Sequence, residues 1–315
     1  MTPTEVVVTG TNPGTHPVLE SWEWTIPAYL FIGGLVAGLM IFGGVIRLRA
    51  EHRLPKAIVL LDWLGLPILG AGLVLLWLDL ANRWNAWRFF TTFRWTSAMS
   101  WGSWILLVTG IVLTLRLAAR AQGAAGRIRL LGRVRPLLRW AGRVVDRFQT
   151  AVDVATIVLG IALGLYTGVL LSQIAARPLW DSAFLAPLFL VSGIATGGAF
   201  LCLFLDGRQH RLLAPVSIGA CGVEIALLTG YLVTAGVGFV TGDPAAELLL
   251  TGDYAPAFWG LVVGAGLIVP LLIEITELVR RHVPALLART APTLKLVGGA
   301  ALRFVVVFAG LETVL

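Results

Sequence analysis

The chain has 315 residues, of which 57% are hydrophobic and only 13% charged, and its formal net charge is +7. Its mean hydropathy is +0.87. Charged residues make up about 25% of an ordinary soluble domain, so this composition excludes that class and predicts an all-α integral membrane protein.

Eight apolar stretches account for most of the chain, and most of them reach the roughly 20 residues that a helix needs to cross a bilayer. In chain order they run from Thr25 to Ile46, Ala57 to Trp77, Ser100 to Leu115, Val152 to Leu171, Ala183 to Leu205, Leu212 to Thr234, Pro256 to Ile275 and Leu296 to Leu311. The sequence therefore predicts eight transmembrane helices.

Most of the 24 basic residues fall in the first, third, fifth and seventh connections, with Arg116 assigned to the third and Lys295 to the seventh. The second and fourth connections hold only Arg83, Arg88, Arg94 and Arg177. Short loops rich in Lys and Arg stay in the cytoplasm, so both termini are predicted to lie outside an inner (cytoplasmic) membrane. The same rule and attraction to anionic membrane lipid account for the basic balance, and we exclude nucleic acid as a partner.

The predicted organisation has five parts: an outward tail (1–24), spans 1–3 (25–115), a basic amphipathic cytoplasmic loop (116–149), span 4 (150–171) and spans 5–8 (183–311). The first helix is expected to serve as its own insertion signal. In the long loop, arginines recur at intervals of four from Arg135 to Arg147. That spacing indicates a surface helix whose simplest role is to anchor on lipid headgroups.

The chain lacks the residues that would hold a redox centre. All four histidines lie in loops or tails, whereas a membrane-embedded b-type haem needs ligands within the helices. Cys202 and Cys221 are in different spans without cluster spacing, which excludes an iron–sulfur cluster or a structural zinc in this protein. ATP-binding and protease motifs are also missing. We therefore expect redox cofactors to come from partner proteins.

Six sequence segments, in order, carry a resemblance to a known family. They are the run from Trp22 to Gly34 with Ala37 and Gly38, the segment Leu78 to Leu80 with Arg83, the run Ser97 to Trp104, the run Tyr166 to Ser172 with Pro178 to Trp180, the run Pro187 to Gly193, and the run Arg303 to Gly310. Together they resemble the NrfD/polysulfide reductase membrane-subunit family over nearly the whole chain.

The resemblance implies a membrane anchor that is not catalytic alone and that is built from two similar four-helix bundles. It would exchange electrons between the quinone pool (menaquinone or ubiquinone) and an outward-facing, ferredoxin-like iron–sulfur subunit. That subunit would serve a catalytic subunit, often a molybdopterin enzyme. Two rival interpretations stay open: a secondary transporter, whose usual sign is a matched pair of interrupted helices, and a non-catalytic anchor.

The resemblance places Tyr166, with neighbouring Thr167, at the quinone pocket, where a phenol can donate to a quinone oxygen; the alternative is an interfacial aromatic anchor. At the start of helix 1, Glu23 beside Trp24 could accept quinol protons or merely favour the helix terminus. Asp79 and Arg83 have the spacing for an i,i+4 pair.

Exposed arginine and aromatic residues are typical of protein contacts, so Arg88, Arg94 and Trp95 are candidates for docking the iron–sulfur subunit.

Ionisable residues at membrane depth are costly and often mark proton routes. The candidates are Asp62, Asp153, Glu224, Glu274 and Arg303. One hypothesis makes Asp62 and Asp153 part of a route from the cytoplasm to the quinone site. The other, slightly favoured, makes Glu224 and Arg303 a buried structural pair and the remaining acids helix-end residues that reach towards water.

Overall fold

The structure is a computed structural model that describes residues 22–49, 54–80, 83–91, 93–123, 134–174, 177–205, 207–240, 245–280 and 285–313. Within these ranges all regular structure is helical, and eight helices have the length and apolar composition of membrane spans. The predicted all-α chain with eight membrane-length helices is therefore confirmed.

In chain order, the elements are α1 (Thr25–Arg49), α2 (Pro55–Asp79), the 3-10 turn η1 (Arg83–Asn85), α3 (Arg88–Thr91), α4 (Ala98–Gln122), α5 (Arg135–Arg147), α6 (Gln149–Ser172), α7 (Leu185–Phe204), α8 (Gly207–Val240), α9 (Ala245–Leu250), α10 (Ala255–Ala257), the π-helix η3 (Phe258–Ile268), α11 (Val269–Arg280) and α12 (Ala285–Glu312). The seventh span is thus made of three consecutive segments, α10, η3 and α11.

Two spans extend well past the ends that hydropathy predicts. Helix α4 continues beyond Leu115 to Gln122, and α12 begins at Ala285 rather than near Leu296. Arg116 and Lys295, which hydropathy assigns to loops, are therefore helical, and both are buried. Hydropathy marks a span as ended at the first charges, whereas Arg and Lys are good helix formers and the helix continues through them.

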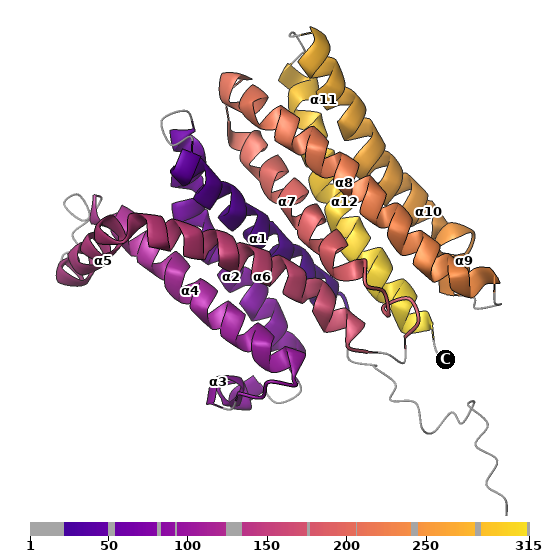
Figure 1. Ribbon diagram of the computed structural model, residues 1–315, viewed down its shortest axis with the longest axis horizontal. Helices are drawn as coiled ribbons and strands as arrows, with labels where there is room; N and C mark the ends of the chain where they lie inside the picture. The colour runs from indigo at the N-terminus through magenta and orange to yellow at the C-terminus, as the bar shows by residue number, and fades with distance from the viewer. Residues whose placement is uncertain are drawn as a thin grey trace, which may run out of the picture.

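Helices α1, α2, α4 and α6 pack against one another on one side of the molecule, and α7, α8, η3, α11 and α12 lie on the other (Figure 1). We call these the N-terminal and C-terminal helix sets. Helix α1 joins them, since it packs against α2 and α6 in its own set and against α7 and α12 in the other. The sidedness of the spans rests on the charge pattern, and the terms "inner" and "outer" follow it.

The contact between α1 and α7 is made by glycines. A Cβ on Gly38 would overlap the carbonyl oxygen of Gly193, and one on Gly197 would overlap the backbone of Gly38. Gly34 lies against Gly193 in the same way. Small residues four apart let two membrane helices approach until their backbones touch. We call these four residues the glycine seam.

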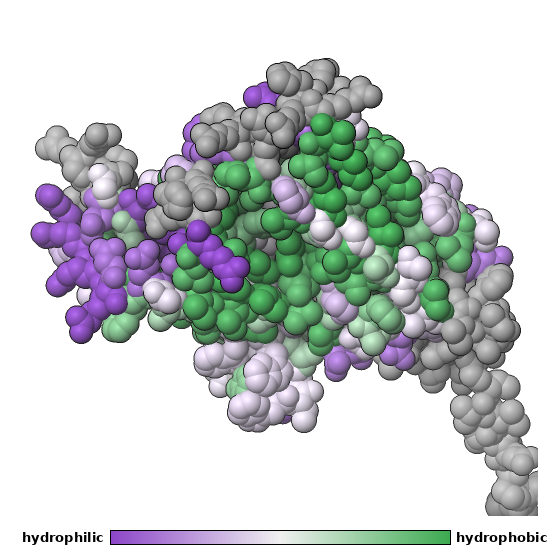
Figure 2. Space-filling model, turned by 45° about the horizontal axis from the view of Figure 1, so that its top comes forward, coloured by the Kyte–Doolittle hydropathy of each residue, from purple (hydrophilic) through white to green (hydrophobic). Residues whose placement is uncertain are grey.

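The surface matches a membrane protein. Apolar residues cover a broad green area in Figure 2, and exposed aliphatic side chains such as Val74, Ile111 and Val158 belong to the spans. Hydrophilic residues gather at one end, around α5. That helix buries Leu138 and Ala141 while its arginines are exposed.

Candidate functional site

An open aromatic groove lies between the outer half of α4 and α6. Its volume is about 380 Å³, and a second, wholly apolar hollow of about 500 Å³ adjoins it. Trp95, Trp101 and Ile105 line both. Volumes of this size suit a small organic ligand that is mostly apolar. We call the two hollows together the outer groove.

Tyr166 of α6 supplies a phenol to this groove. Its ring lies against Gly102 of α4, where a Cβ would overlap the ring and its hydroxyl. Only glycine leaves space for the tyrosine at this helix crossing. The Trp-Gly-Ser sequence at the start of α4 therefore has a structural reason, which is to let Tyr166 lie between the two helices at the edge of the groove.

A second tyrosine, Tyr29 of α1, lies close enough to Tyr166 for the two phenols to interact electrostatically. Its side chain is buried, and its hydroxyl has no hydrogen-bond partner among the described residues. Leaving a buried polar group unpaired costs about 1–3 kcal/mol. Tyr29 is thus an unused donor near the groove, and no sequence pattern distinguishes it from other interfacial tyrosines.

The other residues predicted for the quinone site are more dispersed. Thr167 faces away from the groove, since its methyl group lies against Gly33 of α1 and its hydroxyl donates to the carbonyl of Gly164 at 2.7 Å. Glu23 and Trp24 are exposed at the start of α1.

The i,i+4 pair of Asp79 and Arg83 is not formed, which corrects the prediction. Asp79 instead accepts a hydrogen bond from the Thr25 hydroxyl at 2.9 Å, which ties the outer ends of α1 and α2 together. Arg83 donates to the carbonyl of Leu78 at 2.7 Å and lies over the ring of Trp77. The helix ends at Asp79, so Arg83 is in the turn η1, where the helical spacing no longer applies.

The three docking candidates lie in the outer segment that joins α2 to α4. Arg88, Arg94 and Trp95 are all exposed, and Trp95 is 75% exposed. Its ring packs edge-on against Phe93 and Trp101, so the docking candidates and the outer groove share one aromatic cluster.

The inner half of the N-terminal helix set contains a buried ion network. Asp62 of α2 binds Arg47 of α1 at 2.6 Å and Arg120 of α4 at 3.0 Å. Asp153 of α6 accepts from Arg116 of α4 at 2.5 Å. The two aspartates are 4% and 2% exposed. They are paired inside the protein rather than reaching towards water at helix ends, which corrects that part of the favoured hypothesis.

The C-terminal helix set has a comparable group. Lys295 of α12 donates to Glu274 of α11 at 2.7 Å and to Ser217 of α8 at 2.6 Å, and Ser217 donates to the other carboxylate oxygen of Glu274 at 2.8 Å. All three side chains are buried. Glu274 is therefore also an ion-paired residue, not a free helix-end acid.

Glu224 and Arg303 are connected through a third residue. Arg303 donates to the Ser192 hydroxyl at 2.5 Å, and that hydroxyl is hydrogen-bonded to Glu224. Since the hydroxyl has one proton, it accepts from Arg303 and donates to Glu224. The predicted buried pair is thus bridged by Ser192, a residue that the sequence did not indicate.

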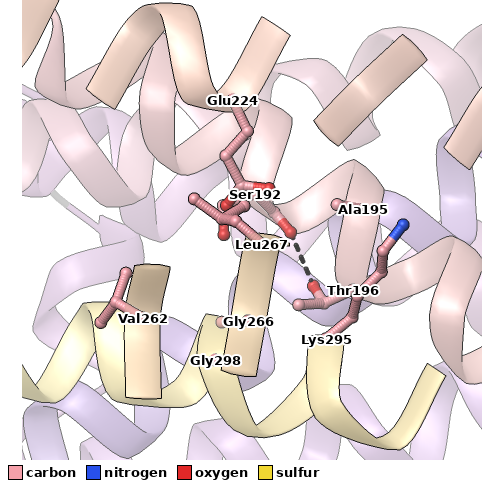
Figure 3. Close-up of a pocket in the computed structure, with 10 residues that line it drawn as sticks. Ser192, Ala195, Thr196, Glu224, Val262, Gly266, Leu267, Lys295 and Gly298 are labelled. Carbon is pink, nitrogen blue, oxygen red and sulfur yellow. Dashed lines mark hydrogen bonds between the residues drawn. The ribbon is translucent and has the colours of Figure 1, made fainter. Parts of the chain in front are cut away.

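A small cavity adjoins this bridge, and Ser192, Thr196, Glu224 and Lys295 help to line it (Figure 3). The Thr196 hydroxyl donates to the Ser192 carbonyl at 2.9 Å, which is the contact dashed in the figure. The volume of about 10 Å³ is close to the minimum for one ordered water. Glu224 and the Lys295 ion pair therefore border the same polar space.

The fold and these sites define a multi-pass membrane protein with an aromatic groove on its outer half and buried ion networks on its inner half. Comparison with known proteins agrees with this class. The sequence model of the family described as "Polysulphide reductase, NrfD" matches residues 11–315. The chain belongs to this NrfD family.

Three relatives match over almost their full length. The protein is 30% identical to "Protein NrfD" of Escherichia coli strain K12, a match that spans 93% of this sequence and 96% of the relative. It is 28% identical to the C subunit of polysulfide reductase of Wolinella succinogenes, where the match spans 92% and 94%. Identity to the "Protein NrfD homolog" of Haemophilus influenzae is 26%, over 93% and 95%.

The inner ion network makes a prediction about stability. Asp153→Asn should destabilise the protein by about 3–5 kcal/mol, because it leaves the Arg116 guanidinium buried without its counter-charge. Thermal unfolding of the purified protein in detergent measures this. Asp146→Asn, which alters an exposed carboxylate on α5, is the matched control and should leave the unfolding temperature unchanged. Equal unfolding temperatures for the two variants would contradict a structural role for the Arg116–Asp153 pair.

Proposed function

We propose that the protein is the membrane subunit of a quinone-linked respiratory oxidoreductase, with its quinone site in the outer groove. One observation carries the proposal: the Tyr166 phenol borders an open, mostly apolar groove, and the Tyr29 hydroxyl lies near it without a partner among the described residues. The polysulfide reductase relative supports a subunit role, because its name describes one polypeptide of a larger enzyme.

The residues of the groove fit a menaquinone or ubiquinone. The ring would lie against Trp95 and Trp101, and the isoprenoid tail would leave towards lipid along the apolar hollow beside Trp104 and Val108. Tyr166 would donate a hydrogen bond to a carbonyl oxygen and so fix the ring's orientation. Tyr29 supplies a second hydroxyl nearby. A quinone brings two-electron, two-proton chemistry to the site, and the tryptophans keep bulk water from its faces.

The position of the groove also suits electron transfer to a partner. Trp95 lines the groove and is exposed beside Arg94 on the outer segment that also carries Arg88. A ferredoxin-like iron–sulfur subunit that docks on this segment would place its cluster near the quinone ring, and a catalytic subunit, such as a molybdopterin enzyme, would complete the path. Cationic arginines and exposed aromatic rings are suited to such a contact.

Substitution of Tyr166 tests the quinone site. Tyr166→Phe should weaken quinol-analogue binding by about two- to tenfold, since it removes one hydrogen bond while keeping the ring against Gly102. Fluorescence quenching of the purified complex measures the affinity. Tyr254→Phe, on the outer side of the C-terminal helix set, removes a phenol that bonds Glu312 and should have no effect. Unchanged binding in Tyr166→Phe would place the quinone elsewhere.

Proton translocation is a second proposed activity, and the cavity beside Glu224 favours it. Glu224, the Ser192–Arg303 bridge and the Lys295–Glu274 pair follow one another around this polar space in the C-terminal helix set. Asp62 and Asp153 are engaged by arginines in the other set, which favours a structural role for them.

Turnover in sealed proteoliposomes tests this second activity. Glu224→Gln should lower the number of protons moved per electron while quinol oxidation continues, because the amide cannot carry a proton across the cavity. Glu247→Gln changes an exposed carboxylate in α9 and should match the wild type. An unchanged stoichiometry in Glu224→Gln would leave the Glu224–Ser192–Arg303 bridge as a purely structural feature.

A further inference from the structure

A separate groove lies on the inner half of the molecule, where the two helix sets meet. Its volume is about 290 Å³. The lining comes from both sets: Ile41, Phe42, Val45, Ile46 and Arg49 of α1, Leu54 before α2, Ile194 of α7, and Leu212, Leu213 and Val216 of α8. We call it the inner groove. It has no residue in common with the outer groove or with the ion networks.

The inner groove begins where the glycine seam ends. Phe42 lies against Gly198 of α7, next to the seam residue Gly197, and the same Phe42 lines the groove. Beyond this point the large side chains of α1 replace glycine at the interface, so the backbones of α1 and α7 can no longer touch. The space that remains is apolar and opens at the surface of the spans, where lipid surrounds the protein.

The groove has the depth of one lipid leaflet. The stretch of α1 from Ile41 to Arg49 rises by about 12 Å at 1.5 Å per residue. Half of the hydrocarbon thickness of a bilayer is about 15 Å. Its walls are aliphatic except for Phe42, and tryptophan does not occur among them. Flexible aliphatic walls of this length suit an acyl chain better than a planar ring.

One charged group lines this groove, at its inner end. Arg49 is exposed, and no hydrogen bond or ion pair engages it in the part of the chain that the structure describes. Arg47, two residues earlier, turns inward instead and binds Asp62. The charge pattern puts Arg49 at the cytoplasmic surface, in the leaflet that carries anionic lipids. A guanidinium there is placed to bind a phosphate.

We propose that the inner groove binds an anionic phospholipid of the cytoplasmic leaflet. One acyl chain fills the groove between α1, α7 and α8, and Arg49 binds the phosphate. The lipid thereby fills the opening between the two helix sets at the inner end of their shared interface. This site is independent of the quinone proposal, because its residues and its leaflet are different.

Native mass spectrometry of the detergent-solubilised complex, with titrated phosphatidylglycerol or phosphatidylcholine, tests the charged end. Arg49→Gln should weaken phosphatidylglycerol binding about fivefold, the effect of one cation at the surface, and leave phosphatidylcholine binding unchanged. Arg139→Gln removes an exposed arginine of α5 on the same side of the membrane and should bind like the wild type. Equal weakening by both variants would show diffuse attraction and overturn the site.

A pair of substitutions on α8 tests the apolar part. Val216→Trp fills the groove and should abolish retention of the phospholipid, whereas Val223→Trp, equally exposed on the same helix but outside the groove, should not. Equal retention by the two variants would overturn the proposal. Inorganic phosphate should not compete with phosphatidylglycerol at millimolar concentration; competition would identify a free phosphate site instead.

Discussion

Helix α1 touches α7 backbone to backbone, because Gly34 and Gly38 face Gly193 and Gly197 without intervening side chains. Lipid gives no hydrophobic reason for helices to associate, so close packing of this kind has to hold the two helix sets together. With α1 fixed in the centre, its outer half presents Thr25 to Asp79 and brings Tyr29 near Tyr166. Its inner half carries Arg47 into the ion network.

The two halves of the membrane differ in their chemistry. The inner half contains charges that are buried and paired, such as Arg116 with Asp153 and Lys295 with Glu274. Removing one partner from such a pair is far more costly than never burying it, which makes these networks rigid points of the fold. The outer half contains the tryptophan-lined groove beside Tyr166. This division leaves the outer half free to accept an apolar ligand next to a docking surface.

The spans, the apolar surface and the family could be predicted from the sequence, because hydropathy and short motifs are local properties. The roles of Arg116 and Lys295 could not, since hydropathy ends a span at the first charge and assigns both residues to loops. Ser192 was missed for a different reason: a lone serine in a helix gives no sign of the arginine and glutamate that other helices bring to it. Tyr166 was identified through its motif, whereas the groove beside it depends on Gly102 and on how α4 crosses α6.

The central claim is that a quinone binds between α4 and α6 on the outer half. The most direct test is photolabelling of the intact complex with an azido-quinone, followed by peptide mapping. The account predicts labels within residues 93–108 and 159–173, which include the lining of the outer groove, and competition by unlabelled quinone. Competed labels confined to α8, α11 or α12 would contradict it.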